Sequence, residues 1–341
     1  MKRDSRPLDA ANVRILDMLS FQGRMSFSEL SSNLGVSINT IRDRVFAMER
    51  RGVIRGFRAV IDRATCGLPS EALIFLKAEP GAKPSIESAI QRAGPLRISA
   101  AFRVVGSHNY VVHAHGSDQF DALAPFRDLQ TPLHFVPLRS KIPLGRQENF
   151  QTWKRPPEEM LRLLELVSQD GRASIRAIAE GMDAPETTVR DQLRNLEQRK
   201  IIHHYAAIVD PCAFGFTLRA YIIGNANDHR KEEIASENIP EGLCNIYMGD
   251  QGSIVLDVAA SSVAELEALT DFVVTHLNLE LEEVLLLASP IVENATAAML
   301  LASRRSVTLH STDYQDAQLI GQRAGDSALL GLLHKQNESV P

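Results

Sequence analysis

The sequence contains an internal repeat, which restricts the possible folds more than any other feature. Gly23-Arg24-Met25-Ser26 recurs 148 residues later as Gly171-Arg172-Ala173-Ser174. The same shift carries Gly67 onto Gly215, and further along the chain it becomes 143 residues. A single short match is common by chance, whereas one register held from Gly23 to Gly67 indicates a tandem duplication. The fold must therefore be a unit that the chain forms twice.

The first part of each copy has the pattern of a helix-turn-helix. In the first copy Gly35 suits the positive φ that ends one helix, and Ser37 suits the cap that begins the next. Residues 53–61 favour a β-strand that leaves this module, so the type is winged. The helix after Ser37 is expected to bury four apolar residues, namely Ile38, Ile41, Val45 and Met48.

The second part of each copy alternates strands and helices in the order βαββαβ, which is a ferredoxin-like arrangement. In the first copy we expect strands at 72–78, 98–105, 110–115 and 133–138, with helices at 84–92 and 118–129. In the second copy we expect strands at 218–224, 243–248, 253–259 and 281–288, with helices at 229–237 and 262–276. The predicted class is α+β, with the open sheet face of each copy covered by the other copy.

This organisation predicts six segments. They are a first helix-turn-helix at 1–62, a first βαββαβ domain at 68–147, a linker at 148–157, a second helix-turn-helix at 158–210, a second βαββαβ domain at 216–294 and a C-terminal extension at 295–341.

Charge is distributed unevenly along the chain. The whole sequence has a net charge of −5, but residues 1–60 hold eleven Lys and Arg against six Asp and Glu, a net of +5. A basic first module on an acidic remainder favours a partner such as DNA. No apolar segment approaches the roughly 18 residues of a membrane span, and the start of the chain lacks a secretory signal. The three cysteines have no metal-binding or disulfide spacing. We therefore expect a cytoplasmic protein without a metal, a cofactor or a membrane partner.

Several motifs in this order resemble the Lrp/AsnC (feast/famine) family of transcriptional regulators. They are Leu8-Asp9, Ile15-Leu16, Gly23-Arg24, Glu29-Leu30, Leu34-Gly35-Val36-Ser37, Arg44-Val45 and Gly52-Val53-Ile54-Arg55-Gly56-Phe57. The resemblance covers residues 8–140 and, more loosely, 158–294. It implies helix-turn-helix modules for double-stranded DNA, and βαββαβ domains that bind an amino-acid-like effector and assemble a homo-oligomer. A chain with two copies resembles a covalent pseudo-dimer of that family.

The resemblance and the basic charge together point to DNA contacts in the first helix-turn-helix. The predicted contacts on the recognition helix are Ser37, Asn39, Thr40, Arg42, Asp43 and Arg44. Taken alone, an exposed polar helix face would be a solvated surface, and Arg44 has the alternative of an ion pair inside the module. Arg24 and Arg55 are further predicted phosphate contacts, with plain surface charges as the equal alternative.

The second helix-turn-helix is predicted to bind DNA more weakly. Asp183 stands in place of Gly35 and Pro185 in place of Ser37, and residues 156–205 hold seven Lys and Arg against nine Asp and Glu. Affinity for DNA falls as cationic phosphate contacts are lost. The predicted weaker contacts are Thr187, Thr188, Arg190 and Arg194.

One turn in each βαββαβ domain corresponds to the family's effector-binding segment. The predicted effector-binding residues are Gly106, Ser107, His108 and Asn109 in the first copy and Gly249, Asp250, Gln251 and Gly252 in the second. The family has acids where this chain has Ser107 and Asn109, and the second copy keeps only Asp250. An amino-acid ammonium group needs such acceptors, so a plain hairpin turn is the alternative.

His113 and His115 alternate along a predicted strand and therefore point to the same face. They could bind a metal, but no third ligand at a recognisable spacing is visible. A solvated pair, or a pair at an interface, is the preferred interpretation.

Two other classes of function stand beside the transcriptional regulator. Paired or fused chains of this type also resemble siroheme decarboxylases, in which case His108, His113 and His115 would contact a tetrapyrrole. A non-enzymatic effector sensor that acts through protein partners is the third. The intact basic module favours the regulator, and no phosphate-binding loop or hydrolase motif supports an enzyme.

Overall fold

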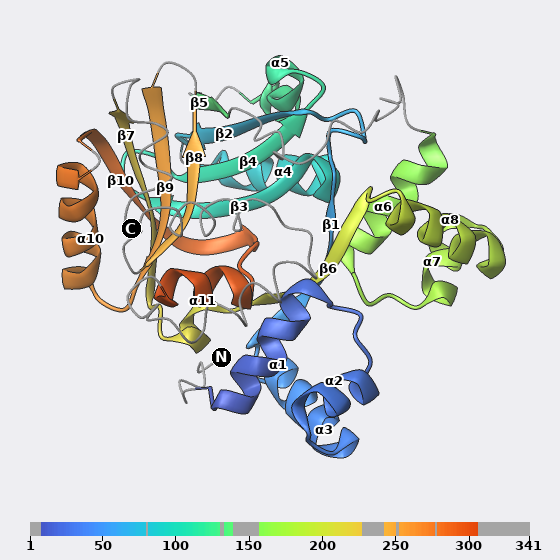
Figure 1. Ribbon diagram of the computed structural model, residues 1–341. Coiled ribbons are helices and arrows are strands. Elements are labelled where there is room, and N and C mark those ends of the chain that lie inside the picture. Colours follow the sequence, from blue (N-terminus) through green and yellow to red (C-terminus); the bar gives the residue numbers. More distant parts are fainter. Residues whose placement is uncertain are drawn as a thin grey trace, which may run out of the picture.

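The chain folds into two helix-turn-helix heads attached to a body built on one eight-stranded β-sheet (Figure 1). This computed structural model describes residues 8–79, 81–129, 133–138, 157–226, 242–249, 252–276 and 278–305. The predicted helix at 229–237, residues 148–156 of the predicted linker, and the end of the extension at 306–341 lie outside the described residues. Within the described ranges, no helix is long and apolar enough to cross a membrane.

The first head consists of α1 (Ala10–Phe21), α2 (Phe27–Leu34) and α3 (Ile38–Arg50), and β1 (Ile54–Ile61) leads out of it. Gly35 ends α2 with φ 65°, and the Ser37 side chain accepts a hydrogen bond from the backbone N–H of Thr40 at the start of α3. Both residues therefore have the predicted local roles. Ile41, Val45 and Met48 are buried as expected, but Ile38 is 48% exposed. Ile38 opens the helix, where fewer neighbouring side chains cover it.

The second head repeats this design with α6 (Glu158–Gln169), α7 (Ile175–Met182) and α8 (Glu186–Gln198), followed by β6 (Ile202–Val209). Asp183 and Lys200 have φ of 52° and 60°, where the first head has Gly35 and Gly52 at 65° and 71°. The turn geometry is thus the same although neither position is a glycine. Positive φ is energetically unfavourable for residues other than glycine. Pro185 supplies no side-chain cap to α8.

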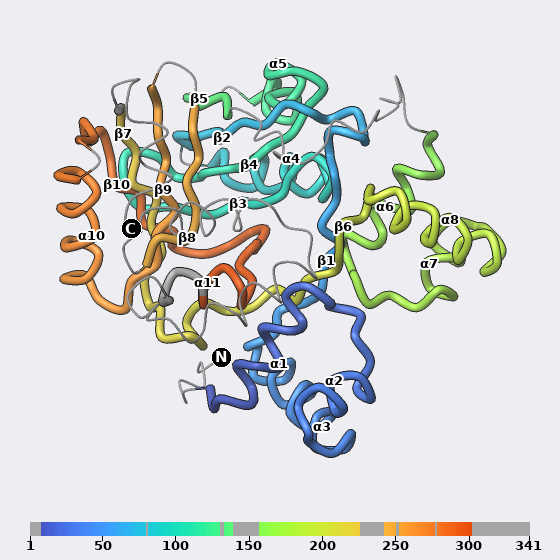
Figure 2. The backbone as a smooth tube through the Cα atoms, in the orientation of Figure 1, coloured from blue at the N-terminus to red at the C-terminus, as the bar shows by residue number. Residues whose placement is uncertain are grey.

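The strands leaving the two heads pair with each other in an antiparallel ribbon, and Figure 2 shows the two traces side by side. Each head packs on the strand of the opposite copy: Ala207 and Val209 of β6 join the core of the first head. Ala59 and Ile61 of β1 join the core of the second. The copies therefore exchange strands, as subunits do in swapped dimers.

A reciprocal pair of contacts, which we call the arginine clasp, fixes this exchange. Arg24 donates from Nε to the carbonyl oxygen of Gly171 at 2.6 Å, and Arg172 donates in the same way to Gly23 at 2.6 Å. The Arg24 guanidinium lies 4.0 Å from the ring centroid of Tyr205, and Arg172 lies 3.9 Å from that of Phe57. Both arginines thus combine a charged hydrogen bond with a cation–π contact.

The glycines of the clasp are required by close backbone approach. The N–H of Gly23 donates to Tyr205 at 2.6 Å, and that of Gly171 donates to Phe57 at 2.7 Å. A Cβ atom at Gly23 would lie 2.9 Å from the backbone carbonyl of Tyr205, and one at Gly171 would lie 2.9 Å from the backbone nitrogen of Arg58. The Gly-Arg repeat that reveals the duplication is therefore also what joins the two copies.

The body contains one complete βαββαβ unit and, from the second copy, the four strands and the last helix of the same pattern, which confirms the predicted α+β class. The first consists of β2 (Ser70–Leu76), α4 (Lys83–Arg97), β3 (Ile98–Val105), β4 (Tyr110–Gly116), α5 (Gln119–Ala122), the 3₁₀ helix η1 (Ala124–Phe126) and β5 (Leu133–Leu138). The described elements of the second are β7 (Leu218–Ala226), β8 (Leu243–Met248), β9 (Ser253–Ala260), α10 (Val263–His276) and β10 (Leu279–Val292), with the 3₁₀ helix η2 (Pro211–Phe214) before them.

Hydrogen bonds join the strands in the order β5-β2-β4-β3-β10-β7-β9-β8, because β10 pairs with both β3 and β7. One face of each half packs against the other half, in a core that includes Phe75 and Phe102 from the first copy and Tyr221 and Leu285 from the second. Helices α4 and α10 cover the opposite faces of their own halves. Each copy therefore covers the open sheet face of the other, as the sequence predicted.

Two segments differ from their predicted form. The helix expected at 118–129 divides into α5 and η1, because Pro125 has no N–H to continue an α-helix. The extension after residue 294 begins with a helix that the sequence did not predict, α11 (Ala297–Arg305). Leu300 of α11 is buried in the core of the first head, and the backbone N–H of Ala298 donates to the Ser20 hydroxyl at 3.1 Å.

The clasp predicts unequal effects of two arginine substitutions in the second head. Arg172→Ala removes the hydrogen bond to Gly23 and the stacking on Phe57, and should lower the free energy of unfolding by about 1–3 kcal/mol. Arg176→Ala removes only an exposed ion pair with Glu180, and should change it by less than about 0.5 kcal/mol. Urea denaturation measures both values, and equal losses would contradict the clasp.

Candidate nucleic-acid interface

The outward face of α3 carries the predicted base-reading side chains. Asn39, Thr40, Arg42 and Asp43 are all exposed, and Figure 1 shows α3 at the outer edge of the first head, away from the body. Arg42 lies 3.9 Å from Asp43, and both side chains remain about half exposed or more. Amide, hydroxyl and guanidinium groups on one helix face can donate to and accept from base edges in a major groove.

Two exposed apolar residues also lie on α3, which the sequence did not predict. Ile38 is 48% exposed and Phe46 is 44% exposed, although both are large apolar side chains. Phe46 packs edge-on against Phe27 of α2, with ring centroids 5.8 Å apart. Apolar groups beside polar ones suit the methyl group of thymine. This apolar surface is missed in the sequence because the helical spacing predicts that Ile38 is buried.

Ser37 and Arg44 serve the head itself. The Ser37 hydroxyl caps α3 and lies 2.8 Å from the Thr40 hydroxyl. Arg44 donates to the Asp9 carboxylate at 2.6 Å and to the side-chain oxygen of Asn12 at 2.9 Å. The structure therefore places Arg44 in the internal ion pair that was its alternative. This pair with Arg44 also holds the pKa of the Asp9 carboxyl below its ordinary value.

The structure places Arg24 and Arg55, the two further predicted phosphate contacts, in contacts with the opposite copy. Arg24 belongs to the arginine clasp, where its guanidinium covers Tyr205. Arg55 forms ion pairs at 3.0 Å with Asp210 and at 3.0 Å with Glu293, both far away in the sequence. Both guanidinium groups therefore hold the two copies together.

Arg55 is one end of a charged network that connects the first head to the body. Glu293 also accepts from Arg219 at 3.0 Å, and Arg219 pairs with Asp257 at 2.6 Å. Arg219 and Asp257 are buried. Burial alone would lower the pKa of Arg219, but Asp257 outweighs it and keeps that pKa well above its ordinary value. The network therefore joins β1, at the base of the first head, to β7 and β9 of the body.

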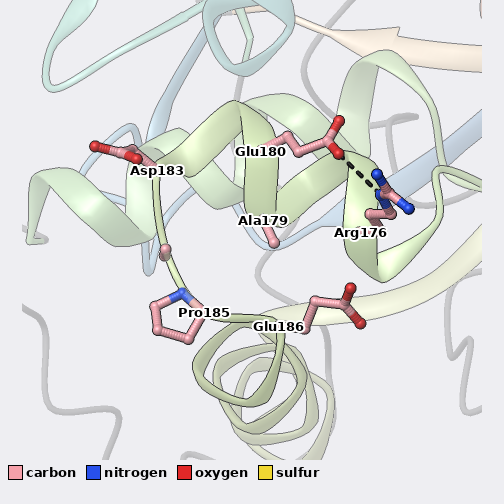
Figure 3. A pocket seen from close by; sticks show the side chains of 7 residues that line it. Arg176, Ala179, Glu180, Asp183, Pro185 and Glu186 are labelled. Carbon is pink, nitrogen blue, oxygen red and sulfur yellow. Dashed lines mark hydrogen bonds and ion pairs between the residues drawn. The ribbon is translucent and has the colours of Figure 1, made fainter.

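The second head presents the same helix face in an acidic setting. Thr187, Thr188, Arg190 and Arg194 are exposed on α8, and Arg194 lies 3.7 Å from Asp191. Beside the start of α8 is a shallow hollow lined by Arg176, Ala179, Glu180, Asp183, Ala184, Pro185 and Glu186 (Figure 3). Its only cation pairs with Glu180 at 2.9 Å, which leaves two carboxylates without a compensating charge in the hollow. These would repel DNA phosphates.

Comparison with known proteins identifies the family. A profile described as winged helix-turn-helix DNA-binding matches twice, at residues 8–55 and 160–203. The HTH-type transcriptional regulator AldR of Mycobacterium tuberculosis is 31% identical over 155 residues, which are 42% of this chain and 87% of that protein. The chain belongs to the Lrp/AsnC family. An uncharacterised HTH-type transcriptional regulator of Pyrococcus abyssi is 42% identical over 73 residues, which are 21% of this chain and 46% of that protein.

A solved structure with the same two-copy fold is that of the siroheme decarboxylase NirDL. It covers 87% of this chain and 98% of its own, with a TM-score of 0.53 and 13% identity. Its complex with an iron-uroporphyrin III analogue has a TM-score of 0.55 and 14% identity, and covers 87% of this chain and 97% of its own. Identity this low indicates a shared fold and carries no information about activity.

In this Lrp/AsnC chain, a carboxylate from the opposite copy occupies the predicted effector-binding turn of the first copy. Glu283 accepts from the backbone N–H of Ser107 at 2.9 Å and lies 3.3 Å from Nδ1 of His108. Leu285 fills the space beside Gly106, where a Cβ would lie 2.4 Å from its Cδ2 atom. The backbone of Asn109 pairs with Val104 and Leu76, as in an ordinary hairpin.

The corresponding turn of the second copy is only partly described. The backbone N–H of Gly249 donates to the carbonyl oxygen of Ser253 at 2.7 Å, and Gly252 has φ 96°. Asp250 and Gln251 lie outside the described residues.

The Glu283 contact predicts a pH-dependent contribution to stability. Burial alone would raise the pKa of Glu283, but hydrogen bonds from Ser107 and the nearby His108 outweigh it and hold that pKa below 4.5. A carboxyl group whose pKa is lower in the folded state than in the unfolded state stabilises the fold. This contribution is fully present above the unfolded-state pKa, and it is lost as the pH falls through the folded-state pKa. Glu283→Gln should therefore lower stability at pH 7, by less than about 1 kcal/mol.

Urea denaturation at pH 7 and again below the folded-state pKa of Glu283 measures the difference. The two proteins should converge at the lower pH. Glu282→Gln is the control. It removes a neighbouring, exposed carboxylate that contacts Asn225 and not the turn at Ser107. A Glu283→Gln difference that stays constant across this range would show that the carboxylate is not held by the turn.

Proposed function

We propose that this Lrp/AsnC chain is a sequence-specific DNA-binding transcriptional regulator in which the first head reads the duplex. The observation that carries the proposal is the exposed polar face of α3, with Asn39, Thr40, Arg42 and Asp43 on the outer edge of a basic module. With α3 in the major groove, these side chains reach base edges while phosphate contacts fix the position of the head.

The second head acts mainly as the partner that positions the first. The arginine clasp and the β1–β6 ribbon hold both heads on one frame, so the chain has the geometry of a dimer without needing a second molecule. The exposed side chains of α8 contribute weaker DNA contacts, because Asp183 and Glu186 bring negative charge to the start of that helix.

The proposed partners beyond DNA are an amino-acid-like effector and further copies of the chain. The effector would bind at the Gly106–Asn109 turn, where its carboxylate replaces Glu283 and alters the pairing of β10. Copies would associate through the outer surface of the βαββαβ domains, since their inner faces already pack together. Light scattering should show an oligomer whose mass or DNA affinity changes when free amino acids are added. A monomer insensitive to every amino acid would exclude both partners.

A siroheme-decarboxylase-like enzyme is the second candidate, and the fold shared with NirDL over 87% of this chain is what favours it. The geometry of the three candidate histidines argues against it: His115 is 2% exposed, and His108 is held by Glu283. We propose on this ground that the chain is not an enzyme.

Substitution of the equivalent arginines in the two heads tests the function. Arg42→Ala should weaken binding to the DNA upstream of the protein's own gene by at least about tenfold, because it removes a cation from the exposed face of α3. Arg190→Ala, at the same position of α8, should weaken it by less than about threefold. Gel shifts at a fixed, stated salt concentration measure both.

Three outcomes would count against this assignment. A larger loss with Arg190→Ala would reverse the assignment of the two heads. Equal, small losses would remove α3 from the interface. No binding to DNA, together with uptake of siroheme and a Soret absorption band, would favour the enzyme.

A further inference from the structure

A cluster of three metal-ligating side chains lies in the body, where the two halves of the eight-stranded sheet pack together. Glu71 in β2 pairs in register with His115 in β4, and Leu73 pairs with His113. Alternate residues of a strand share a face, so Glu71, His113 and His115 project from one face of the sheet. This face packs against the second copy, whose Tyr247 meets the His113 ring edge-on with centroids 5.4 Å apart.

No third ligand for His113 and His115 is visible from spacing along the chain, and the strand register supplies one in Glu71. The ligand atoms of Glu71, His113 and His115 all lie within 4.8 Å of one another. The His115 side chain is 2% exposed and that of His113 is 11% exposed, whereas Glu71 is 36% exposed. The two imidazoles are therefore enclosed, and the carboxylate lies on the side open to solvent.

Two buried nitrogens of this cluster have no hydrogen-bond partner. They are Nε2 of His113 and Nδ1 of His115, and each faces a different oxygen of Glu71, at 3.6 Å and 3.5 Å. Buried polar atoms are rarely left without a partner, because they lose their hydration on folding. These separations are longer than a normal hydrogen bond.

Ser99 holds the His115 ring through the nitrogen that does not face Glu71. The Ser99 hydroxyl lies 2.9 Å from Nε2 of His115 and donates to the backbone oxygen of His113 at 3.4 Å. Nδ1 of His115 is thereby directed at a carboxylate oxygen of Glu71 3.5 Å away.

The spacing of these atoms suits a bound cation. Two ligands on one tetrahedral zinc ion, with bonds of 2.0–2.1 Å, stand about 3.3 Å apart. The nitrogen-to-oxygen separations of 3.6 Å and 3.5 Å in the cluster are close to this value.

We propose that Glu71, His113 and His115 bind a divalent transition-metal ion of the zinc type. Two imidazoles and one carboxylate leave a fourth position for water or another ligand. Ser99 is a positioning residue, since it orients His115 through the ring nitrogen that does not face the ion. The ion would join β2 to β4 at a point that contacts Tyr247 of the second copy, and so would respond to how the copies pack.

Arg63 limits the strength of the site without blocking it. Its guanidinium donates to the backbone oxygens of Leu96 at 3.0 Å and Pro95 at 3.3 Å, so it is held by carbonyl groups. Its positive charge would weaken the binding of any dication at the cluster. The preference for a zinc-type ion over Mg²⁺ or Ca²⁺ comes instead from the two imidazole nitrogens, because Mg²⁺ and Ca²⁺ prefer oxygen ligands.

Metal titration of the full chain tests the proposal. After treatment with a chelator, the protein should take up Zn²⁺ at one strong site and should not take up Mg²⁺. Co²⁺ in its place should give the intense visible absorption of low coordination number. Glu71→Gln and His113→Gln should each weaken Zn²⁺ binding by at least about tenfold, and Ser99→Ala by about tenfold.

His276→Gln is the matched control, because His276 is an exposed histidine on α10 that contacts Phe272. It should leave the affinity unchanged. If the ligand variants fail to fold, Ser99→Ala and the Co²⁺ spectrum of the unaltered chain still decide the matter. Absence of strong Zn²⁺ uptake, or uptake that Ser99→Ala leaves unchanged and that gives only a weak octahedral Co²⁺ spectrum, would overturn the proposal and leave an ordinary carboxylate–histidine contact.

Discussion

The arginine clasp is the interaction on which the arrangement of this molecule depends. Each copy alone would expose the apolar face of its sheet and the strand face on which the opposite head packs. The clasp brings Gly23 and Gly171 against the opposite strand at hydrogen-bond distance, which sets the register of the β1–β6 ribbon. That ribbon in turn fixes both heads, since the first helix of each packs on the strand of the other copy. A covalent link between copies keeps their effective concentration high, so the exchanged arrangement forms within one chain.

Much of this fold follows from local sequence, and the exceptions have physical reasons. The repeat, the turn at Gly35 and the strand periodicity depend on neighbouring residues, so the two heads and the two βαββαβ units could be predicted. The packing of each head on the strand of the opposite copy could not be predicted, because the apolar pattern of β1 suits either head equally well. Helix α11 was missed because its burial depends on the core of the first head, almost 280 residues earlier, where Ser20 receives it. The break at Pro125 could have been predicted from proline chemistry alone.

For the sites, too, the sequence indicates the chemistry of a side chain but does not indicate which groups that side chain contacts. The sequence identified the polar face of α3, because helical spacing separates Asn39 and Arg42 from the buried positions. It did not identify the roles of Arg24 and Arg55, since a charge in the sequence does not reveal the carbonyl or carboxylate that meets it. Glu71 was missed for a related reason. It lies 42 residues before His113, and only the antiparallel register of β2 and β4 brings the two together.

Duplication within one chain lets the two copies change separately while the frame stays symmetric. In a homodimer each substitution appears twice, so Asp183 and Pro185 would alter both recognition helices at once. Here they alter only the second head. Its turn at Asp183 keeps the left-handed backbone conformation that Gly35 has in the first head. Contacts between the copies show the same freedom: Glu283 of the second copy closes the turn at Ser107 of the first. Arg55 of the first copy likewise meets Asp210 and Glu293 of the second. The arginine is therefore kept at the base of the head with the basic reading face, where carboxylates from the other copy neutralise it.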